Sequence, residues 1–480
     1  MGIDIPWSLL KIEAGLIALT LFLLVLDIFL PKEKRGTTLA DMAMLGLAGL
    51  FCWLPFEWGH FGTGFSGTYI QDGVAICFKA LFLLAAFFTV FMAREYRAQL
   101  KRGQGEFVLL ILFGLIGMMF MASANDFLLF FVSLETLSIS LYIMTAYLRD
   151  SESSIEAGVK YLIQGALSTA IFLFGLSFLY GTTGSTSYGE MRGFFGSAGV
   201  IPVPFIFGMV LVVSSLGFKI AAVPFQLWAP DIYEGAPTPV TAYLAIASKA
   251  AGFAALIRLS LTVFSPMNTS LTLLFSVLSG LTIFYGNLGA IPQTNIKRLM
   301  GYSSIGHAGY LLMGLAAFGQ SGREALLFYL FSYLFSTAGV FLVLVAVSSE
   351  TSSDQVSELA GLSKRSPHLA AAMLISLMSL AGVPPLSGFF AKFYLLWASV
   401  KSGLWWLAAI GAFNVITSLY YYLKIIKVIY VDEPVNPAPL KVSKDHRLVQ
   451  YFAMFGVVLL GIFQGPFVKI AQDAFKSLVP

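Results

Sequence analysis

The sequence predicts an all-α integral membrane protein with about fourteen transmembrane helices. Of its 480 residues, 58% are hydrophobic and 11% are charged, whereas a soluble domain carries about 25% charged residues. Apolar runs long enough to cross roughly 30 Å of hydrocarbon recur along the whole chain. These runs lack the period-two alternation of a membrane barrel, so helices are the structure that satisfies their backbone in lipid.

Fourteen apolar runs are predicted to span the membrane, and they make the chain, residues 1–480, a single polytopic membrane domain. The longest polar stretches, near residues 349–366 and 431–447, are too short to fold as separate domains. The predicted spans cover residues 9–30, 38–55, 74–93, 107–123, 126–148, 157–181, 200–227, 238–262, 268–290, 296–318, 323–348, 367–399, 403–430 and 448–470.

Lysine and arginine residues orient these spans, because loops on the cytoplasmic side of a membrane are enriched in them. Seventeen of the 29 Lys and Arg residues fall in one set of alternate loops. Seven fall in the opposite loops, helix ends and termini, and five fall within spans. This asymmetry predicts a multi-pass protein of fourteen spans with both termini on the outside.

Several ionisable residues lie inside the predicted spans, where each costs roughly 2.5–3.5 kcal/mol on insertion scales. Helix packing alone needs no such residues, because apolar side chains pack at lower cost. We therefore interpret them as candidate functional residues. They are Glu135, Lys219, Lys249, His307 and Lys392.

Two further lysines, Lys79 and Lys160, are close enough to helix ends to extend their ammonium groups to the membrane surface, and we expect both to do so. Lys160 has a competing interpretation. Gln164 and Ser168 follow it at i+4 and i+8, so the three residues form a polar stripe that leads into the membrane.

Structural interpretations also remain open for the other candidates. His307 could be a core histidine bonded to Ser303 or Ser304 one turn earlier. Glu135 and Lys219 could be a purely structural ion pair, although such a pair does not explain the further buried lysines.

Lysine suits proton transfer when it is removed from water. Burial in general lowers the pKa of a lysine from about 10.4, and a nearby carboxylate raises it again. Moving that carboxylate therefore switches a lysine between holding and releasing a proton. We interpret Glu135 and Lys219 as such a pair.

Prolines predict interruptions in two spans beside buried lysines. Pro224 follows Lys219 by five residues, and Pro384–Pro385 precedes Lys392. A proline inside a helix donates no backbone hydrogen bond and clashes with the carbonyl four residues earlier. Broken helices of this kind line hydrated cavities in transporters.

The spacing of these residues suggests an internal repeat. Lys219 follows Glu135 by 84 residues, and Lys392 follows His307 by 85. We therefore predict a first five-helix repeat over residues 107–262 and a second over residues 268–430. Five is odd, so the second repeat enters the membrane inverted, as in transporters with alternating access.

Four ordered motifs resemble the antiporter-like subunits of proton-pumping NADH:quinone oxidoreductase (respiratory complex I) and the related Mrp sodium/proton antiporters. The similarity is closest to the N-type subunit. The chain ends without the long lateral helix of the L-type subunit, and Lys392 stands where the M-type subunit typically has a glutamate. The motifs are SLETLSISLYI around Glu135, GFKIAAVPFQLWAPDIYEGAPTPV, QTNIKRLMGYSSIGHAGYLLMG and LAGVPPLSGFFAKFYLL.

The resemblance implies roles for these residues. Glu135 would modulate Lys219, Lys249 would be the central relay lysine, and Lys392 would lead to the outside exit. His307 and Lys160 would be supporting relay positions. The chain would be a subunit of a translocase that couples electron transfer from NADH to quinone, in other subunits, to proton pumping.

The resemblance also implies that NADH, FMN, iron–sulfur clusters and quinone bind to partner subunits. The sequence shows no dinucleotide fingerprint after a strand, and its two cysteines, Cys52 and Cys77, form no ligand cluster. We expect both cysteines to be small buried hydrophobic side chains. The expected partners are neighbouring antiporter-like and small membrane subunits and the lipid bilayer, with no nucleic acid.

Two rival interpretations remain. The first is a subunit of an Mrp-type sodium/proton antiporter, which would change pH in a sodium-dependent way without a flavin-containing partner. The second is a scaffold subunit that moves no ion, in which replacing Lys219 or Glu135 would leave coupled pumping intact.

Overall fold

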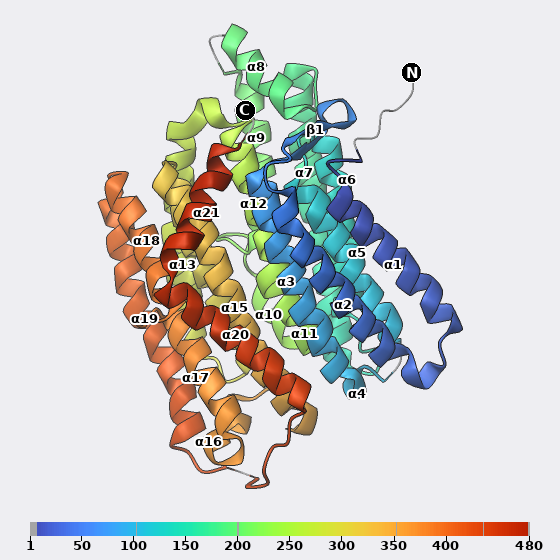
Figure 1. Ribbon diagram of the computed structural model, residues 1–480. Helices are drawn as coiled ribbons and strands as arrows, with labels where there is room; N and C mark the ends of the chain where they lie inside the picture. The colour runs from blue at the N-terminus through green and yellow to red at the C-terminus, as the bar shows by residue number, and fades with distance from the viewer. Residues whose placement is uncertain (1–6, 102, 199–200, 352, 435, 479–480) are drawn as a thin grey trace.

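The computed structural model describes residues 7–101, 103–198, 201–351, 353–434 and 436–478. These residues form a bundle of long α-helices, most of which run up and down along one common direction (Figure 1). The predicted all-α, multi-pass membrane fold is therefore confirmed.

The first half of the bundle carries the first group of candidate residues. Its helices are α1 (Lys11–Phe29), α2 (Lys32–Glu57), α3 (Gly73–Glu95), α4 (Arg97–Leu100), α5 (Gln104–Ala122), α6 (Phe127–Thr145), α7 (Glu152–Thr183), α8 (Tyr188–Ala198), α9 (Val203–Ile220), α10 (Trp228–Gly235), α11 (Thr238–Tyr243), the π-helical turn η2 (Leu244–Ser248) and α12 (Lys249–Leu261). The short elements β1 (Gly62–Gly64), η1 (Phe65–Gly67) and β2 (Tyr69–Gln71) lie between α2 and α3.

The second half carries the remaining candidates. Its elements are η3 (Ser265–Met267), α13 (Asn268–Ala290), α14 (Ile296–Ala316), α15 (Gln320–Thr351), η4 (Val356–Leu359), α16 (Leu362–Arg365), α17 (Pro367–Ala381), α18 (Ser387–Lys401), α19 (Trp405–Tyr430), α20 (Lys444–Ile462) and α21 (Gln464–Lys476).

Eleven helical spans in the described residues are long and apolar enough to cross a membrane, or twelve if the bent pair α20 and α21 counts as one span. The count of fourteen stays a prediction. The predicted span over residues 296–318 corresponds to α14, and that over residues 367–399 corresponds to α17 and α18 with a break between them; neither is among the eleven.

The last predicted span, residues 448–470, is wrong as a continuous helix. α20 and α21 meet at an angle of 83°. Pro466 explains the bend, because it lies in the first turn of α21, where its missing N–H group is tolerated. The proline also cannot donate a backbone hydrogen bond to the carbonyl of Ile462, four residues earlier, so α20 does not continue past Ile462.

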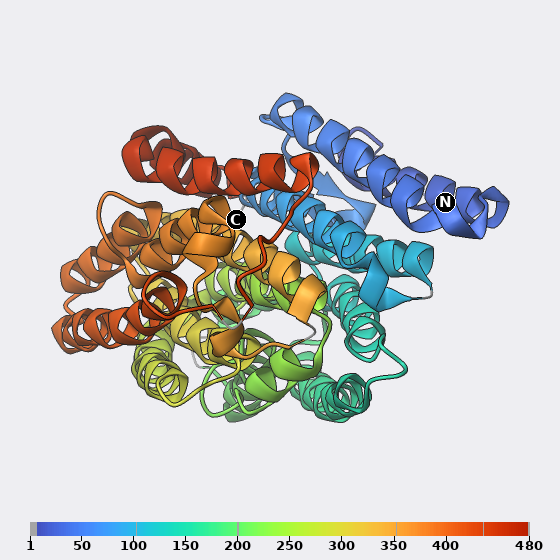
Figure 2. The ribbon, with the colours of Figure 1, turned by 90° about the horizontal axis from the view of Figure 1, so that it is seen from below.

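The core of the bundle is formed by α3, α15 and the continuous segment from α11 through η2 to α12. Every residue in the apolar window of that segment is buried, whereas α1, α2, α7 and α19 bury about a third of theirs or less. Seen from below, α1 and α2 lie at an edge of the molecule beside α20 (Figure 2). The central segment therefore carries Lys249 far from lipid.

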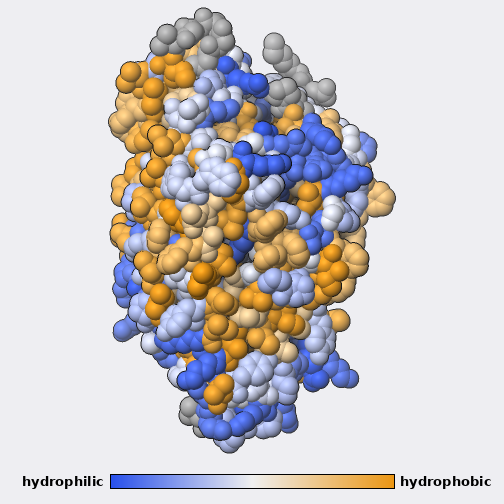
Figure 3. All heavy atoms as spheres, turned by 90° about the vertical axis from the view of Figure 1, so that its left-hand side faces the viewer, coloured by the Kyte–Doolittle hydropathy of each residue, from blue (hydrophilic) through white to orange (hydrophobic). Residues whose placement is uncertain are grey.

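The outer surface is apolar, as a lipid-facing surface must be. Figure 3 shows hydrophobic side chains over much of the middle of the face that carries α18 and α19, with hydrophilic ones gathered toward its lower end.

Cys77 is buried on α3, but Cys52 is exposed on α2. The expectation that both cysteines are buried is thus wrong for Cys52, which lies on the outer face of a peripheral helix.

A small hairpin of β1 and β2 adds two strands to the otherwise helical fold. Gly62 pairs with Gln71, and Gly64 pairs with Tyr69, in an antiparallel register. Gly67, in the turn, has a φ of +90°, which glycine adopts without strain. The hairpin lies at the end of the bundle where α1 begins (Figure 1).

Both predicted helix interruptions are present. α9 ends at Ile220, Ala221 takes the left-handed conformation with a φ of 58°, and α10 begins seven residues later. α17 ends at Ala381, Gly382 has a φ of 88°, and α18 begins at Ser387. The two broken helices run in opposite directions through the bundle (Figure 1).

Helices α13 and α14 pack closely through glycines, and α14 carries several candidate residues. A Cβ atom at Gly286 would overlap the backbone of Gly306 and would lie 2.8 Å from the carbonyl oxygen of Tyr302. Backbone atoms cannot move aside as a flexible side chain can.

Gly286→Ala should therefore force α13 away from α14 and lower the thermal unfolding midpoint of the purified protein. Gly181→Ala is the matched control, because no atom lies within 4 Å of a Cβ atom at Gly181. An unchanged midpoint for Gly286→Ala would contradict the close packing.

Candidate functional site

Three lysines are buried in the middle of the helical bundle. Lys219 lies in the last turn of α9, Lys249 is the first residue of α12, and Lys392 lies in α18. Within the described residues, the ammonium group of each is hydrogen-bonded to neutral oxygen atoms and has no carboxylate within 4.0 Å. Their positive charges are therefore stabilised by hydroxyl and carbonyl dipoles alone.

Lys219 and Glu135 lie on neighbouring helices but do not form an ion pair. Lys219 Nζ donates to Ser138 Oγ at 3.0 Å. Glu135, one turn earlier on α6, is half-buried and accepts a hydrogen bond from Thr169 Oγ1 at 2.8 Å. Ser138 thus stands between the lysine and the turn that carries the carboxylate.

A cavity of about 10 Å³, close to the smallest space that holds one water molecule, lies beside Lys219 and is rich in hydroxyl groups. Ser138, Ser168, Thr169 and Ser215 line it, and the hydroxyl oxygens of Ser168 and Ser215 are 3.0 Å apart. A polar cavity of this kind holds water when two or more partners are within reach. The arrangement therefore gives the buried ammonium neighbours that can exchange protons.

Lys249 directly follows the π-helical turn η2, a feature frequent at functional sites. Its ammonium group donates to the carbonyl oxygen of Ser304 at 2.5 Å and also contacts the Ser304 hydroxyl. The Tyr233 hydroxyl lies 3.1 Å from the same Ser304 hydroxyl oxygen. Lys249 is thus fixed to α14 through one serine.

His307 lies one turn further along α14, between two tyrosines. Its Nδ1 is 2.6 Å from the Tyr329 hydroxyl, and its Nε2 is 3.2 Å from the Tyr422 hydroxyl. The alternative of a direct bond from His307 to Ser303 or Ser304 is wrong. Tyr422 stands between, and its hydroxyl is 2.5 Å from Ser303 Oγ.

Lys392 lies just after the second helix break and binds a carbonyl oxygen that the break exposes. Its ammonium group donates to the Ala381 carbonyl oxygen at 3.0 Å and to Ser418 Oγ at 3.3 Å. The carbonyl is free because α17 ends at Ala381. The Tyr310 ring centre is 5.1 Å from the ammonium nitrogen, and a cavity of about 10 Å³ borders both Lys392 and His307.

Helix α14 therefore brings together three of the predicted residues. Its Ser304 binds Lys249, its His307 shares a cavity with Lys392, and its Tyr310 covers the same lysine. These contacts join segments that are far apart in the sequence. The smallest sequence separation among them is 55 residues, between Lys249 and Ser304.

Lys160 lies apart from this group, toward the N-terminal end of α7. Its side chain is 42% exposed and pairs with Glu156 at 2.7 Å and with Asp231 at 3.4 Å. Asp231 also accepts a hydrogen bond from Arg298 at 2.6 Å. This placement agrees with an ammonium group that reaches the membrane surface, and Ser168 of the predicted stripe lines the Lys219 cavity instead.

Sequence reasoning missed a second group of buried charges. The expectation that Lys79 reaches the surface is wrong, because its side chain is fully buried and its ammonium nitrogen lies 2.6 Å from Glu13 Oε1. Asp72 and Arg258 form another buried pair at 2.9 Å. The signal that could have found them was an acidic residue at the start of an apolar run, as at Glu13.

No group of three or more His, Cys, Asp or Glu side chains within residues 7–101, 103–198, 201–351, 353–434 and 436–478 is placed to hold a metal ion. The side chains gathered at the described site are those of lysine, histidine, tyrosine and serine, which are groups that can bind and exchange protons.

Comparison with known proteins gives consistent results. Residues 124–418 match the family described as NADH:quinone oxidoreductase/Mrp antiporter, transmembrane. A protein of Desulforamulus reducens named NADH-quinone oxidoreductase subunit N is 40% identical over 476 residues, which cover 99% of each chain.

Two solved structures have the same fold. A chain of respiratory complex I from Thermus thermophilus superposes with a TM-score of 0.82 at 32% identity and covers 96% of this chain and 99% of its own. A chain of the Mrp complex from a Dietzia species superposes with a TM-score of 0.83 over 98% of this chain and 96% of its own. Its identity is only 20%, so that likeness concerns the fold alone.

The contacts of the buried lysines predict that these lysines do not stabilise the fold. Lys219→Met and Lys249→Met remove a desolvated charge that no carboxylate balances, so the thermal unfolding midpoint should stay unchanged or rise. Lys79→Met is the matched control. It leaves the Glu13 carboxylate buried without a cation, which should cost about 3–5 kcal/mol. A loss of stability for Lys219→Met as large as that for Lys79→Met would contradict this account.

Proposed function

Because this chain belongs to the NADH:quinone oxidoreductase/Mrp antiporter family of membrane proteins, we propose that it is an N-type membrane subunit of a proton-pumping NADH:quinone oxidoreductase. The observation that carries the proposal is the set of three buried lysines, each held by neutral oxygens and placed beside hydroxyl groups. The relatives that cover the whole chain carry the name of this subunit.

A lysine held only by neutral oxygens is suited to exchange its proton. A nearby carboxylate would stabilise the ammonium form, whereas hydroxyl groups can also donate a hydrogen bond to the neutral amine, and carbonyl oxygens can accept one from it. The difference in free energy between the two forms is therefore small enough for a modest change in the surroundings to reverse it.

Glu135 is the group that supplies this change at the first lysine. Its carboxylate is one helical turn from Ser138, the partner of Lys219, and it is held by Thr169. A shift of Glu135 toward Lys219 favours the ammonium form, and a shift away favours release. Because Glu135 is half-buried at the edge of this chain, a neighbouring subunit can move it.

The proton then passes toward Lys249. The two lysines lie on facing helices, since a Cβ atom at Gly252, three residues after Lys249, would lie 3.6 Å from Lys219 Cγ. From Lys249 the route continues through Ser304 and the group of Ser303, Tyr422 and His307 to the cavity that borders Lys392. Lys392 leads to the exit, and Lys160 is a supporting position near the entrance.

The two five-helix repeats, residues 107–262 and 268–430, are part of the proposal. Each contains one broken helix as its fourth helix, and the two breaks are traversed in opposite directions. The lysines differ in position, since Lys219 precedes its break and Lys392 follows its own. The repeats would then place one titratable lysine beside each helix break, before the break in the first repeat and after it in the second.

The electron-transfer chemistry belongs to other subunits. NADH, FMN, iron–sulfur clusters and quinone would bind there, and this chain would contact neighbouring antiporter-like and small membrane subunits. The start of α1 and the end of α21 lie at the same end of the bundle (Figure 1). This supports the placement of both termini on one face, and we propose that it is the periplasmic face of the cell inner (plasma) membrane.

Lys219→Gln should abolish the contribution of this subunit to proton pumping. The assembled complex is reconstituted in vesicles, and the number of protons moved per NADH is measured beside NADH oxidation by an artificial acceptor. The ratio should fall while the acceptor activity stays normal, because the electron-transfer centres are elsewhere. Lys364→Gln, which removes an exposed lysine paired with Glu433, is the control and should leave both unchanged.

An unchanged ratio for Lys219→Gln would favour a scaffold that moves no ion. Pumping that depends on sodium, in a complex without flavin, would instead favour an Mrp-type antiporter.

A further inference from the structure

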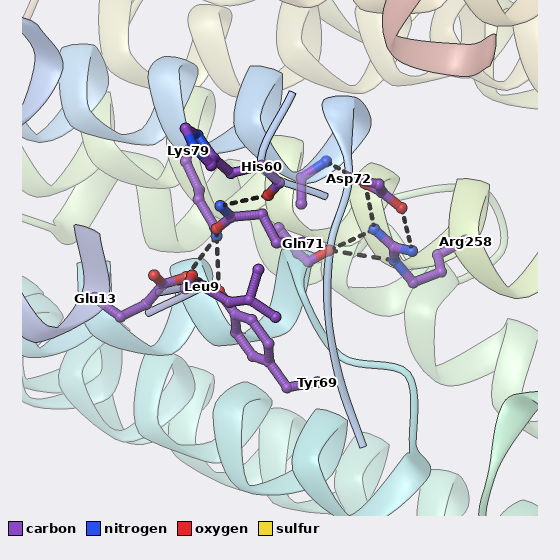
Figure 4. A network of polar contacts seen from close by, with 10 residues as sticks. Leu9, Glu13, His60, Tyr69, Gln71, Asp72, Lys79 and Arg258 are labelled. Carbon is purple, nitrogen blue, oxygen red and sulfur yellow. Dashed lines mark hydrogen bonds and ion pairs between the residues drawn. The ribbon is translucent and has the colours of Figure 1, made fainter. Parts of the chain in front are cut away.

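A second cluster of buried charges lies at the end of the bundle where α1 begins, away from the three lysines (Figure 4). The carboxylate of Glu13 on α1 lies 2.6 Å from the ammonium group of Lys79 on α3. Lys79 also donates to the Tyr69 hydroxyl at 3.0 Å and to Gln71 Oε1 at 3.2 Å. The hairpin of β1 and β2 thus supplies two of the three oxygens around the ammonium group.

The neighbouring pair of Asp72 and Arg258 shows what a purely structural ion pair looks like in this chain. Both oxygens of Asp72 accept hydrogen bonds from Arg258, at 2.9 and 3.1 Å, and Oδ1 also caps α3 through Ala75 N. Arg258 further donates to the Ala122 carbonyl oxygen. Every oxygen of the carboxylate has a partner.

Glu13 differs from Asp72 in one respect. Its Oε1 contacts Lys79 and accepts from the Tyr69 hydroxyl at 2.9 Å, but its Oε2 is buried and has no hydrogen-bond partner within the described residues. A buried carboxylate oxygen without a partner costs free energy that a structural pair avoids.

The cluster lies between the outer surface and the central helices. The Tyr69 hydroxyl is 3.2 Å from the carbonyl oxygen of Leu9, which is only partly buried. On the inner side, α3 packs directly against η2 and α12, the elements that precede and carry Lys249. The cluster is therefore placed to receive a proton from the centre of the chain and to release it outside.

We propose that Glu13, Lys79 and Tyr69 form a proton-accepting site on the outer side of this subunit, at which Glu13 Oε2 holds a proton before its release. The proposal rests on the function proposed above. In the accepting step an N–H bond of the Lys249 ammonium group breaks and an O–H bond forms at Oε2, so that the carboxylate becomes neutral while Lys79 stays an ammonium group. In the releasing step the same proton passes to water on the outer side, and the ion pair forms again.

The charges around the site favour release. When Glu13 is neutral, the Lys79 charge is no longer balanced, and it repels the added proton. The charged or titratable groups on the elements packed around Glu13 are Lys79 on α3, Tyr69 on β2, Lys11 on α1, Glu57 on α2, Asp72 before α3 and Arg258 on α12. Lys11 is already paired with Glu57, and Asp72 is already paired with Arg258. Lys79 is therefore the charge that is left unbalanced when Glu13 takes up a proton.

The test is the number of protons moved per electron by the assembled complex with Glu13→Gln, reconstituted in vesicles. The substituted amide keeps the size of the side chain but cannot take up the proton, so the ratio should fall, though less than for Lys219→Gln, because the exit beyond Lys392 remains. Glu57→Gln is the matched control. Glu57 is a buried carboxylate near the same end, and Lys11 and Trp53 both bond to it. This variant should keep the normal ratio, and Glu13→Asp should restore most of the loss.

A normal ratio for Glu13→Gln, with a lowered ratio for Lys219→Gln, would overturn this inference and leave the proposed function intact. Normal ratios for both would overturn both. If the Glu13→Gln complex does not assemble, Tyr69→Phe decides, because it keeps the ion pair and removes only the bridging hydroxyl. Its ratio should fall, and a normal ratio would overturn the inference.

Discussion

The absence of a carboxylate beside each of the three central lysines is the constraint on which the rest of the site depends. A buried ammonium group balanced by a carboxylate is a fixed charge that holds helices together. The same group among neutral oxygens is poorly stabilised, and small shifts of nearby charges change its protonation. Lys219, Lys249 and Lys392 are all of the second kind within the described residues, whereas Lys79 and Arg258 are of the first.

Irregular backbone lies next to each of the three lysines, and at Lys392 it supplies one of the oxygen partners. The end of α17 frees the Ala381 carbonyl for Lys392, and a π-helical turn precedes Lys249. At the first break, the Phe218 carbonyl oxygen near the end of α9 accepts hydrogen bonds from the indole N–H of Trp228 and from the backbone N–H of Ala221. It is therefore already bonded to groups other than Lys219. A helix that continued past Ala381 would have bonded the carbonyl of that residue internally, whereas Lys219 and Lys249 find their partners at Ser138 and Ser304 in neighbouring helices.

Sequence patterns were sufficient for the fold and for the burial of the main residues. A lysine in the middle of an apolar run, as at Lys219 or Lys392, is predicted to face the interior of the bundle, because a charged side chain in lipid is costly. A proline such as Pro224 cannot continue a helix, so the interruptions were also predictable. The partners of these residues were not, because Tyr422 and His307 meet across 115 residues of sequence and a tyrosine in an apolar helix gives no local signal.

The second charge cluster was missed for a related reason. Lys79 stands near a helix end, where a lysine usually extends to the surface, and only the distant Glu13 keeps it buried. Arg258 likewise lies in the last turn of α12, yet it is buried and bonded to Asp72, 186 residues away in the sequence.

Ordered water in a high-resolution map of the assembled complex tests the account most directly. The account predicts water molecules in the cavities beside Lys219 and Lys392, continuing past Lys249 and reaching Glu135, since each cavity is lined by hydroxyl groups. Cavities that are dry, with apolar side chains closing the space between the lysines, would contradict it.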